Sequence, residues 1–482
     1  MNDHLIRFYH RLPGRLRPIV ASLRGYYLRS WRYGPETDLL IEEAIARESW
    51  SPDKWEAWRQ ERLAYILHRA AKQVPYYRQL WRDRRRRGDK ASWEYLENWP
   101  VLKKDALREA PAAFVADDCD KQRLFHEHTS GTTGKPLDLW RSRRTVRALY
   151  ALSEARDRYW HGVSRNDRWA ILGGQLVVPV RQRRPPFWVW NRALNQLYMS
   201  SYHLAPDLIP SYLDALQRFR VRYLLGYTSS LYALAQEVLR LGRPDLGMTV
   251  VITNAEPVAD YQRRVIAEAF QCPVRETYGM AEMVAAASEC QAGSLHLWPE
   301  LGYLEIFDGN RPVGPGREGS FIGTGLLNDD MLLIRYEVGD RGVMAIERET
   351  CACGRRLPML KSVEGRMDEV LYTADGRRIG RLDPVFKAKL PVREAQIVQE
   401  TLNRVRVRFV PVSRFDSAAA ASITERLRDR MGDIEVILEE VDEIPRTSCG
   451  KFRAVISHLP SDVRRELEGA SSSRHNIGME RR

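Results

Sequence analysis

The sequence predicts an α/β protein with a large N-terminal domain of layered α/β sheets, a β-rich subdomain and a small, mobile C-terminal α+β domain. Between about residues 120 and 345, short apolar runs such as Trp169–Leu172 and Val250–Ile252 alternate with helical patterns, which is typical of largely parallel sheets. Residues 301–346 contain instead short strand-like runs joined by glycine and proline turns. After Gly365-Arg366 a strand, a helix and a strand follow one another, which predicts the small domain.

These patterns divide the chain into four regions. With 482 residues, the chain is too long for a single hydrophobic core. We expect residues 1–110 to form a helical region that packs on the main domain, and residues 111–366 to form the α/β core with the β-rich subdomain. Residues 367–469 form the small domain. The polar and basic tail, residues 470–482, is expected to be disordered.

The composition is that of an ordinary globular protein, with 44% hydrophobic and 29% charged residues. No apolar run approaches the roughly 20 residues that span a bilayer. The N-terminus is charged and lacks the apolar core of a signal peptide, which predicts a cytoplasmic location. Six cysteines in a chain of this length do not form a disulfide framework.

The net charge of +13 is unevenly distributed. Residues 1–35 contain seven arginines and one aspartate, interleaved with aromatic residues. These residues either pack as helices on the main domain or form a patch for anionic lipid headgroups or an acidic carrier. Peripheral association with the inner face of the membrane therefore remains open. A nucleic-acid partner is not expected, because the sequence contains no recognised nucleic-acid-binding module.

A glycine-rich segment, His128-Thr-Ser-Gly-Thr-Thr-Gly-Lys-Pro136, lies between two strand-like runs. Its backbone N–H groups and hydroxyls, together with the charge of Lys135, are suited to holding a polyphosphate. It differs from the loop of GTPases and kinases, because two residues separate Gly131 from Gly134 and a proline follows the lysine. An isolated match of this kind would be as consistent with a hairpin turn.

Four further segments follow in a fixed order, and the five motifs together resemble the adenylate-forming superfamily of acyl-CoA synthetases, peptide-synthetase adenylation domains and luciferases. The four are Asn254-Ala-Glu-Pro257, Glu276-Thr-Tyr-Gly-Met-Ala-Glu282, Arg335–Gly342 with Gly365-Arg-Met-Asp368, and Ile444–Lys451. The resemblance extends from about residue 60 to 460. Within the superfamily the chain is most similar to the phenylacetate–coenzyme A ligase branch, and there to the CapK-type proteins of capsular polysaccharide biosynthesis. The segments that carry this finer resemblance are 225–231, 351–354 and 392–399.

The resemblance implies an enzyme that binds ATP, and it assigns candidate site residues. The phosphate-binding loop would consist of Ser130, Gly131, Thr132, Thr133, Gly134 and Lys135. Ala255, Glu256, Pro257, Tyr278 and Gly279 would line the adenine, Asp340 would bind the ribose, and Arg366 would add a ribose or phosphate contact. Glu282 would hold Mg²⁺, since a carboxylate beside phosphates needs a cation. Asp368 would be the hinge of the small domain.

Lys451 is the strongest catalytic candidate, beside Glu282 and Thr132. Activation of a carboxylic acid by ATP brings a carboxylate against the α-phosphate, so catalysis must neutralise charge and align the attack. A lysine near the end of a mobile domain can bridge the two anions. The alternative for Lys451 is a surface lysine after a turn.

Cys290, His296, Cys351 and Cys353 form two short knuckles with the spacing of a structural Zn²⁺ site. The branch that this chain resembles often has cysteine and histidine at these positions. The alternative is buried free cysteines with a surface histidine. The other three cysteines, Cys119, Cys272 and Cys449, lack such partners in the sequence.

The sequence therefore predicts an ATP-dependent carboxylic acid ligase that forms an acyl-adenylate and transfers the acyl group to coenzyme A. The acid pocket is expected between Gly173-Gly174, 226–230 and Ala255, with Trp169, Tyr227 and Met280 as walls. Transfer to an amine or hydroxyl without coenzyme A is the first alternative, since the segment Asp375–Arg381 departs from the usual acceptor-tunnel signature. A non-catalytic nucleotide-binding regulator is the second. The sequence does not predict the acid or the oligomeric state.

Overall fold

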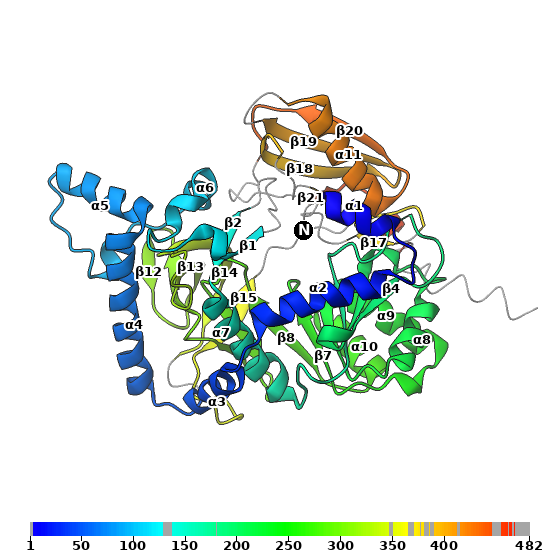
Figure 1. Cartoon of the computed structure of the whole chain (residues 1–482), viewed down its shortest axis with the longest axis horizontal. Coiled ribbons are helices and arrows are strands. Elements are labelled where there is room, and N and C mark those ends of the chain that lie inside the picture. The colour runs from blue at the N-terminus through cyan, green and yellow to red at the C-terminus, as the bar shows by residue number, and fades with distance from the viewer. Residues whose placement is uncertain are drawn as a thin grey trace, which may run out of the picture.

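The computed structural model describes residues 3–128, 137–179, 181–346, 350–364, 371–375, 377–379, 385, 390–411, 415–445, 455–460, 462–464 and 467. It has the predicted α/β architecture, with a large layered domain and a smaller α+β domain above it in the view of Figure 1. Searched over these residues, no helix is long and apolar enough to cross a membrane.

The first 110 residues are mainly helical, as predicted. Ser51 caps one helix by accepting a hydrogen bond from the Lys54 N–H, with Pro52 at the first helical position. Pro75 separates that helix from the next and begins it. The helices of this region are α1 (Asp3–Arg11), α2 (Arg17–Arg32), α3 (Thr37–Arg47), α4 (Pro52–Gln73), α5 (Pro75–Arg86) and α6 (Lys104–Glu109).

In the described part of the chain, a sheet of 13 strands runs through the large domain in the order β12-β11-β13-β14-β15-β10-β9-β8-β7-β6-β3-β5-β4. The predicted β-rich subdomain is thus continuous with the parallel sheet rather than separate from it. The strands are β3 (Trp169–Gly173), β4 (Trp188–Asn191), β5 (Gln196–Ser200), β6 (Tyr223–Tyr227), β7 (Val250–Asn254), β8 (Val274–Gly279), β9 (Ala286–Glu289), β10 (Leu295–Leu297), β11 (Gly302–Asp308), β12 (Arg311–Val313), β13 (Glu318–Gly325), β14 (Tyr336–Met344) and β15 (Met359–Glu364).

Strand β8 is the junction between the two halves of this sheet. It pairs parallel with β7 on one side and antiparallel with β9 on the other. The strands from β5 through β3, β6 and β7 to β8 are parallel, and those beyond β9 are antiparallel. Chain direction therefore reverses between β8 and β9, while β7 and β8 place their carboxyl ends at the same edge of the sheet.

One face of the parallel half is closed by helices that follow its strands. Buried residues of α8 (Ile209–Arg218), α9 (Thr228–Leu241) and α10 (Asp260–Phe270) pack with Leu172, Leu224 and Val251 in one apolar cluster. This is the helix-on-sheet layering that alternation of strand and helix predicts. The opposite face lies under α2 and α7 (Arg143–Ser153) (Figure 1).

The basic N-terminal segment packs on the large domain. Helix α2 lies along β4, where Gly25 is buried against Asn191: a Cβ atom at Gly25 would come within 2.1 Å of the Asn191 Oδ1. A side chain at position 25 would therefore displace the Asn191 amide. Ile19, Leu23 and Tyr26 of the same helix are more than half exposed, and membrane association of this region stays a prediction.

The small domain contains the predicted strand–helix–strand unit. Its sheet has the order β20-β19-β18-β21, and α11 (Ser417–Met431) covers it through Ile423 and Leu427. The Arg377 guanidinium donates to the carbonyl of Tyr202 at 2.7 Å and so joins the two domains. The strands are β16 (Leu371–Tyr372), β17 (Arg378–Ile379), β18 (Val392–Thr401), β19 (Arg404–Pro411), β20 (Glu435–Glu440) and β21 (Val455–Ser457). The predicted boundary at 366/367 and the tail lie outside the described residues.

Candidate functional site

A cavity of about 630 Å³ opens at the carboxyl ends of β7 and β8, where the sheet changes direction. This is the position at which open α/β sheets bind ligands. The predicted residues Ala255, Glu256, Pro257, Tyr278, Gly279, Glu282 and Asp340 all line it. Segments far apart in the sequence are thus brought to one place, as their motifs predicted.

Tyr278 and Asp340 approach each other across this cavity. The Tyr278 hydroxyl donates to Asp340 Oδ2 at 3.0 Å, which links β8 to β14. The edge of the Tyr278 ring packs on Phe321, with the ring centroids 5.9 Å apart. An aromatic face beside a carboxylate can hold a base and hydrogen-bond a sugar hydroxyl.

Glu282 is buried, and its charge is retained by its neighbours. Its Oε1 accepts from Lys104 Nζ at 3.4 Å and from the Tyr336 hydroxyl at 2.9 Å. Burial alone would raise the pKa of Glu282, but the Lys104 charge and the Tyr336 hydrogen bond outweigh it, so the pKa is lowered. A buried, ionised carboxylate suits a hard cation. Lys104 already supplies one positive charge at this place.

The segment Ala255–Pro257 offers its backbone to the cavity. Ala255 has φ +65°, a conformation that turns the chain sharply after β7. The Glu256 carboxylate accepts from the N–H of Ser229 at 2.8 Å and from its hydroxyl at 3.1 Å. A carboxylate is favourable at the N-terminus of α9. The side chain of Glu256 therefore fixes this turn.

Three residues of this site were not singled out from the sequence: Lys104, Arg141 and Tyr336. Arg141 donates to Glu127 Oε2 at 2.5 Å and to the carbonyl of Ala281, which anchors the segment before Glu282. Tyr336 lies inside the motif Arg335–Gly342, so the motif contained a signal for it. Lys104 follows another lysine before a short helix, and nothing local distinguishes it from a surface lysine.

The predicted phosphate loop is carried by a two-stranded hairpin, β1 (Phe125–His128) and β2 (Asp138–Arg141). Asp138 Oδ1 lies 2.9 Å from His126 Nε2 and 2.6 Å from His128 Nδ1. Hydrogen bonding first to His128, and then to His126, lowers the pKa of Asp138 against the effect of burial. This cluster, also missed in the sequence, closes the base of the hairpin. The loop residues Ser130, Gly131, Thr132, Thr133, Gly134 and Lys135 lie outside the described residues, as do Arg366, Asp368 and Lys451.

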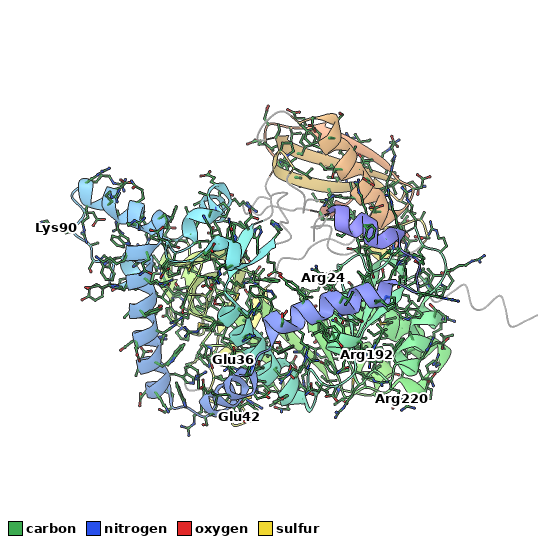
Figure 2. All side chains as sticks on the ribbon, viewed as in Figure 1. Arg24, Glu36, Glu42, Lys90, Arg192 and Arg220 are labelled. Atoms are coloured by element: carbon green, nitrogen blue, oxygen red, sulfur yellow. The ribbon has the colours of Figure 1, made fainter. Side chains whose placement is uncertain are left out.

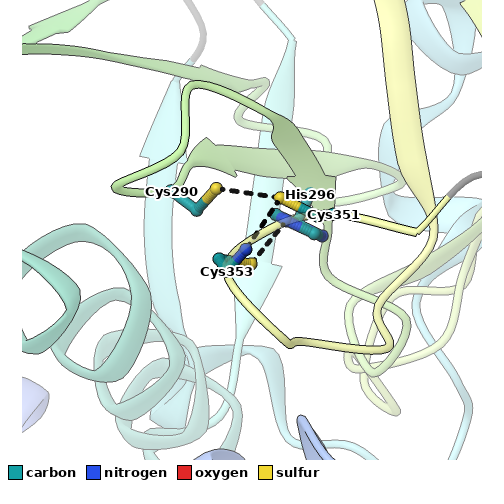
Figure 3. Close-up of side chains that lie close together, drawn as sticks. All are labelled: Cys290, His296, Cys351 and Cys353. Atoms are coloured by element: carbon teal, nitrogen blue, oxygen red, sulfur yellow. Dashed lines mark hydrogen bonds between the residues drawn. The ribbon is translucent and has the colours of Figure 1, made fainter.

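The four predicted metal ligands come together beside β10 (Figure 3). Their ligand atoms all lie within 4.8 Å of one another. Cys290 Sγ is 3.5 Å from Cys351 Sγ, and Cys353 Sγ is 3.4 Å from His296 Nε2. The other ring nitrogen of His296 lies 3.2 Å from the Leu357 carbonyl, so Nε2 is the nitrogen that faces the cysteines.

These distances fit a tetrahedral metal. Bonds of about 2.3 Å to sulfur and about 2.0 Å to nitrogen separate the ligand atoms by roughly 3.5–3.8 Å. Cys290 and His296 are buried, and the four ligands leave no position for a substrate. The donor set therefore fits a structural zinc ion.

A second, larger cavity of about 1060 Å³ adjoins the first. Of the predicted walls of the acid pocket, Trp169 lines this larger cavity and Met280 lines the smaller one. Tyr227, which the structure describes, lines neither.

Comparison with known proteins agrees with this geometry. Residues 371–458 match the family model of the CapK C-terminal domain. Protein CapK of Staphylococcus aureus is 25% identical over 460 residues, covering 94% of this chain and 99% of that protein. The chain is thus similar to CapK over almost its whole length.

Two further relatives extend the comparison. A phenylacetate-coenzyme A ligase of Thermus thermophilus is 24% identical, with 88% of this chain and 99% of that enzyme covered. The crystal structure of 2-hydroxyisobutyryl-CoA ligase in the postadenylation state has a similar fold, with a TM-score of 0.53 and 21% identity. That match covers 89% of this CapK-like chain and 94% of the ligase chain.

Glu276, which lines the smaller cavity, predicts a pH dependence of stability. Burial raises its pKa to about 7, partly opposed by Arg263. A raised pKa means that folding favours the protonated form, so this contribution is complete below pH 4.5 and is lost as the pH rises through 7. Each pKa unit corresponds to about 1.4 kcal/mol, which partial solvent exposure reduces to roughly 1–2 kcal/mol in total.

Glu276→Gln should therefore stabilise the protein at pH 8 relative to the unchanged chain, by roughly 2–4 °C in melting temperature per kcal/mol. At pH 5 the two proteins should melt together. Thermal denaturation at both pH values measures this, with Glu268→Gln, an exposed residue of α10, as the control. Equal shifts at pH 5 and pH 8 would contradict the assignment.

Proposed function

We propose that this protein is an AMP-forming carboxylic acid ligase that makes an acyl-adenylate from ATP and transfers the acyl group to coenzyme A. The observation that carries the proposal is the convergence of Tyr278, Asp340 and Glu282 on one cavity at the junction strand β8. The similarity to phenylacetate-coenzyme A ligase, which spans most of both chains, supports the same activity.

In this proposal each part of ATP has its own set of side chains. Tyr278 and the backbone of Ala255–Pro257 hold the adenine, and Asp340 accepts hydrogen bonds from the ribose, with Arg366 beside it. The glycine-rich loop, including Thr132 and Lys135, holds the leaving phosphates on the β1–β2 hairpin. Glu282 would hold Mg²⁺, which supplies positive charge to the phosphates.

Attack of the acid on the α-phosphate brings two anions together, so the surrounding cations determine the rate. Lys104 is held at the buried Glu282, and Lys451 would arrive with the small domain. The small domain contacts the large one through Arg377 and through Arg7, which pairs with Glu425 at 2.8 Å. Rotation about Asp368 would exchange these contacts between the two half-reactions.

The two alternatives to this function are transfer of the acyl group to an amine or hydroxyl without coenzyme A, and a non-catalytic nucleotide-binding regulator. Transfer to an amine or hydroxyl would use the same adenylate site. The segment that departs from the acceptor-tunnel signature includes Arg377, whose guanidinium also donates to the Arg430 carbonyl at 3.1 Å. Arg377 therefore has a structural role, and its presence in this segment does not argue against coenzyme A as the acceptor. A role in capsule or cell-envelope metabolism rests on similarity to CapK.

The two half-reactions test the function directly. Lys451→Ala should lower acid-dependent formation of pyrophosphate by about two to four orders of magnitude, the scale of removing one preorganised charge. The same variant should convert a chemically prepared acyl-adenylate and coenzyme A to thioester at nearly the unaltered rate, because the thiol attack does not need this lysine.

Both reactions are measured with a library of acids, with and without coenzyme A. Release of pyrophosphate without thioester, followed by product on addition of an amine or sugar, would select the first alternative. Binding of ATP without pyrophosphate release from any acid would select the non-catalytic regulator. Equal losses in both half-reactions would make Lys451 a structural residue.

We also propose that Cys290, His296, Cys351 and Cys353 hold one structural Zn²⁺. The two knuckles join the β9–β10 turn to the loop before β15, so a metal would fix these two segments to each other and to β10, an interior strand of the sheet. Zinc of this kind supplies folding free energy rather than chemistry.

Purified protein should accordingly contain one zinc per chain by elemental analysis. Cys351→Ala should lose it, and chelation should lower the melting temperature before adenylation is lost at low temperature. Cys272→Ala, a buried cysteine outside the cluster, should retain the metal. Full zinc content in Cys351→Ala would exclude this ligand set.

A further inference from the structure

The larger cavity lies between helix α2 and the open face of the parallel sheet. Alternate residues of the strands form its floor, among them Ile171, Tyr198 and Leu225. The opposite face of the same strands is filled by α8, α9 and α10. Helix α2 covers this face of the sheet and is called the roof of the cavity below, but it does not fill the space between itself and the strands. The cavity that is left has a volume of about 1060 Å³. That volume is at the upper end for sites that enclose a drug-sized ligand.

The roof is held in place by a specific contact. The close approach of Gly25 to Asn191 leaves no room for a side chain, so α2 has a fixed position along β4. The Asn191 side chain lines the cavity, is 6% exposed, and its Oδ1 has no hydrogen-bond partner among the described residues. The contact with Gly25 covers this oxygen.

The larger and smaller cavities meet at shared residues. Arg32, Tyr150, Asn254 and Thr277 line both. The Arg32 guanidinium lies over the Tyr150 ring, 4.6 Å from its centroid. An acid in the larger cavity can therefore present its carboxylate at this junction, next to the site proposed for the adenylate.

The roof is also strongly cationic. Arg24, Leu28 and Arg32 are spaced four residues apart, so they share one side of the helix, and the two arginines are separated by about 12 Å along it. Arg29 lines the cavity beside them. Figure 2 labels Arg24 on α2, which crosses between the sheet and the small domain.

These arginines differ from the other cations that line the cavity. Arg158 pairs with Glu154 at 3.2 Å, and Arg165 pairs with Asp38 at 2.6 Å. Arg24, Arg29 and Arg32 form no ion pair with any carboxylate in the described part of the chain. Of the acids in the lining, Glu127 pairs with Arg141, and Asp157 is hydrogen-bonded by Ser153 and Ser288. The roof therefore carries positive charge that the cavity itself does not neutralise.

We propose that the substrate is a large acid with a second anionic group, held in the larger cavity under α2. Its reacting carboxylate lies at the junction beside Arg32, and the second anion lies near Arg24 and Arg29. The apolar residues between these ends, Leu28, Ile171 and Leu225, contact the body of the molecule. This inference rests on the proposed function and assigns its substrate class.

The experiment compares α,ω-dicarboxylates with monocarboxylates of equal chain length in acid-dependent ATP–pyrophosphate exchange. The unaltered chain should have a lower KM for the dicarboxylates, with an optimum at one length. Arg24→Gln and Arg29→Gln should each raise the KM for the dicarboxylate about tenfold, the effect of losing a charge-assisted hydrogen bond. KM for the matched monocarboxylate should change less than about twofold, since a neutral end makes no such bond. Arg15→Gln, an exposed arginine outside the cavity, is the control.

Equal KM values for both series would overturn this inference and leave the proposed function intact. If no acid of either series supports ATP–pyrophosphate exchange, the proposed function is overturned, and this inference with it. Sedimentation with phosphatidylserine vesicles provides a further arm, because Ile19, Leu23 and Tyr26 are exposed on the same helix. Loss of vesicle binding in Arg24→Gln and Arg29→Gln, with unchanged KM ratios, would assign these arginines to a membrane surface instead.

Discussion

The reversal of chain direction at β8 is the constraint on which the candidate site depends. Because β7 and β8 are parallel, their carboxyl ends and the segments that follow them lie at the same edge of the sheet, and β8 then pairs antiparallel with β9. The smaller cavity opens at this edge. Tyr278 is the last residue but one of β8, and its hydrogen bond to Asp340 fixes the opposite wall from β14. The family resemblance supplies the adenine and ribose positions of the proposal, and this junction brings their residues together.

Charge is the second organising element. A carboxylate buried as deeply as Glu282 would ordinarily be protonated, and here Lys104 and Tyr336 keep it ionised. The site thus holds a preorganised pair before any nucleotide binds. A substrate with several negative charges is stabilised by cations that are already in position, because little reorganisation free energy is spent when the substrate binds. The cationic roof formed by α2 extends the same principle to the acid.

Much of this arrangement could be predicted from the sequence because each motif is a short segment whose residue types indicate its local structure. The alternation of strands and helices predicted a parallel sheet, and the family resemblance predicted that the residues after β7 and β8 belong to one site. The spacing of cysteine and histidine predicted the four ligands that meet beside β10. In the small domain, the predicted strand, helix and strand correspond to β19, α11 and β20.

What could not be predicted depends on contacts between distant segments. Lys104 reaches Glu282 across 178 residues, and no local pattern marks it. In the sequence, Gly25 is only a residue that is unfavourable within a helix. Its close contact with Asn191 becomes evident only in the structure. The continuity of the β-rich region with the parallel sheet depends on β8–β9 pairing, and the residues between those strands have no hairpin signature.

The most direct measurement of the central claim is the dissociation constant of ATP, determined by calorimetry in the absence of any acid. Asp340→Ala should weaken binding by about tenfold or more, because it removes a charged acceptor from the proposed ribose contact. Glu337→Ala, on the same strand but paired with Lys103 at the surface, should bind ATP as the unaltered chain does. An unchanged dissociation constant in Asp340→Ala would show that the cavity at β8 is not the nucleotide site.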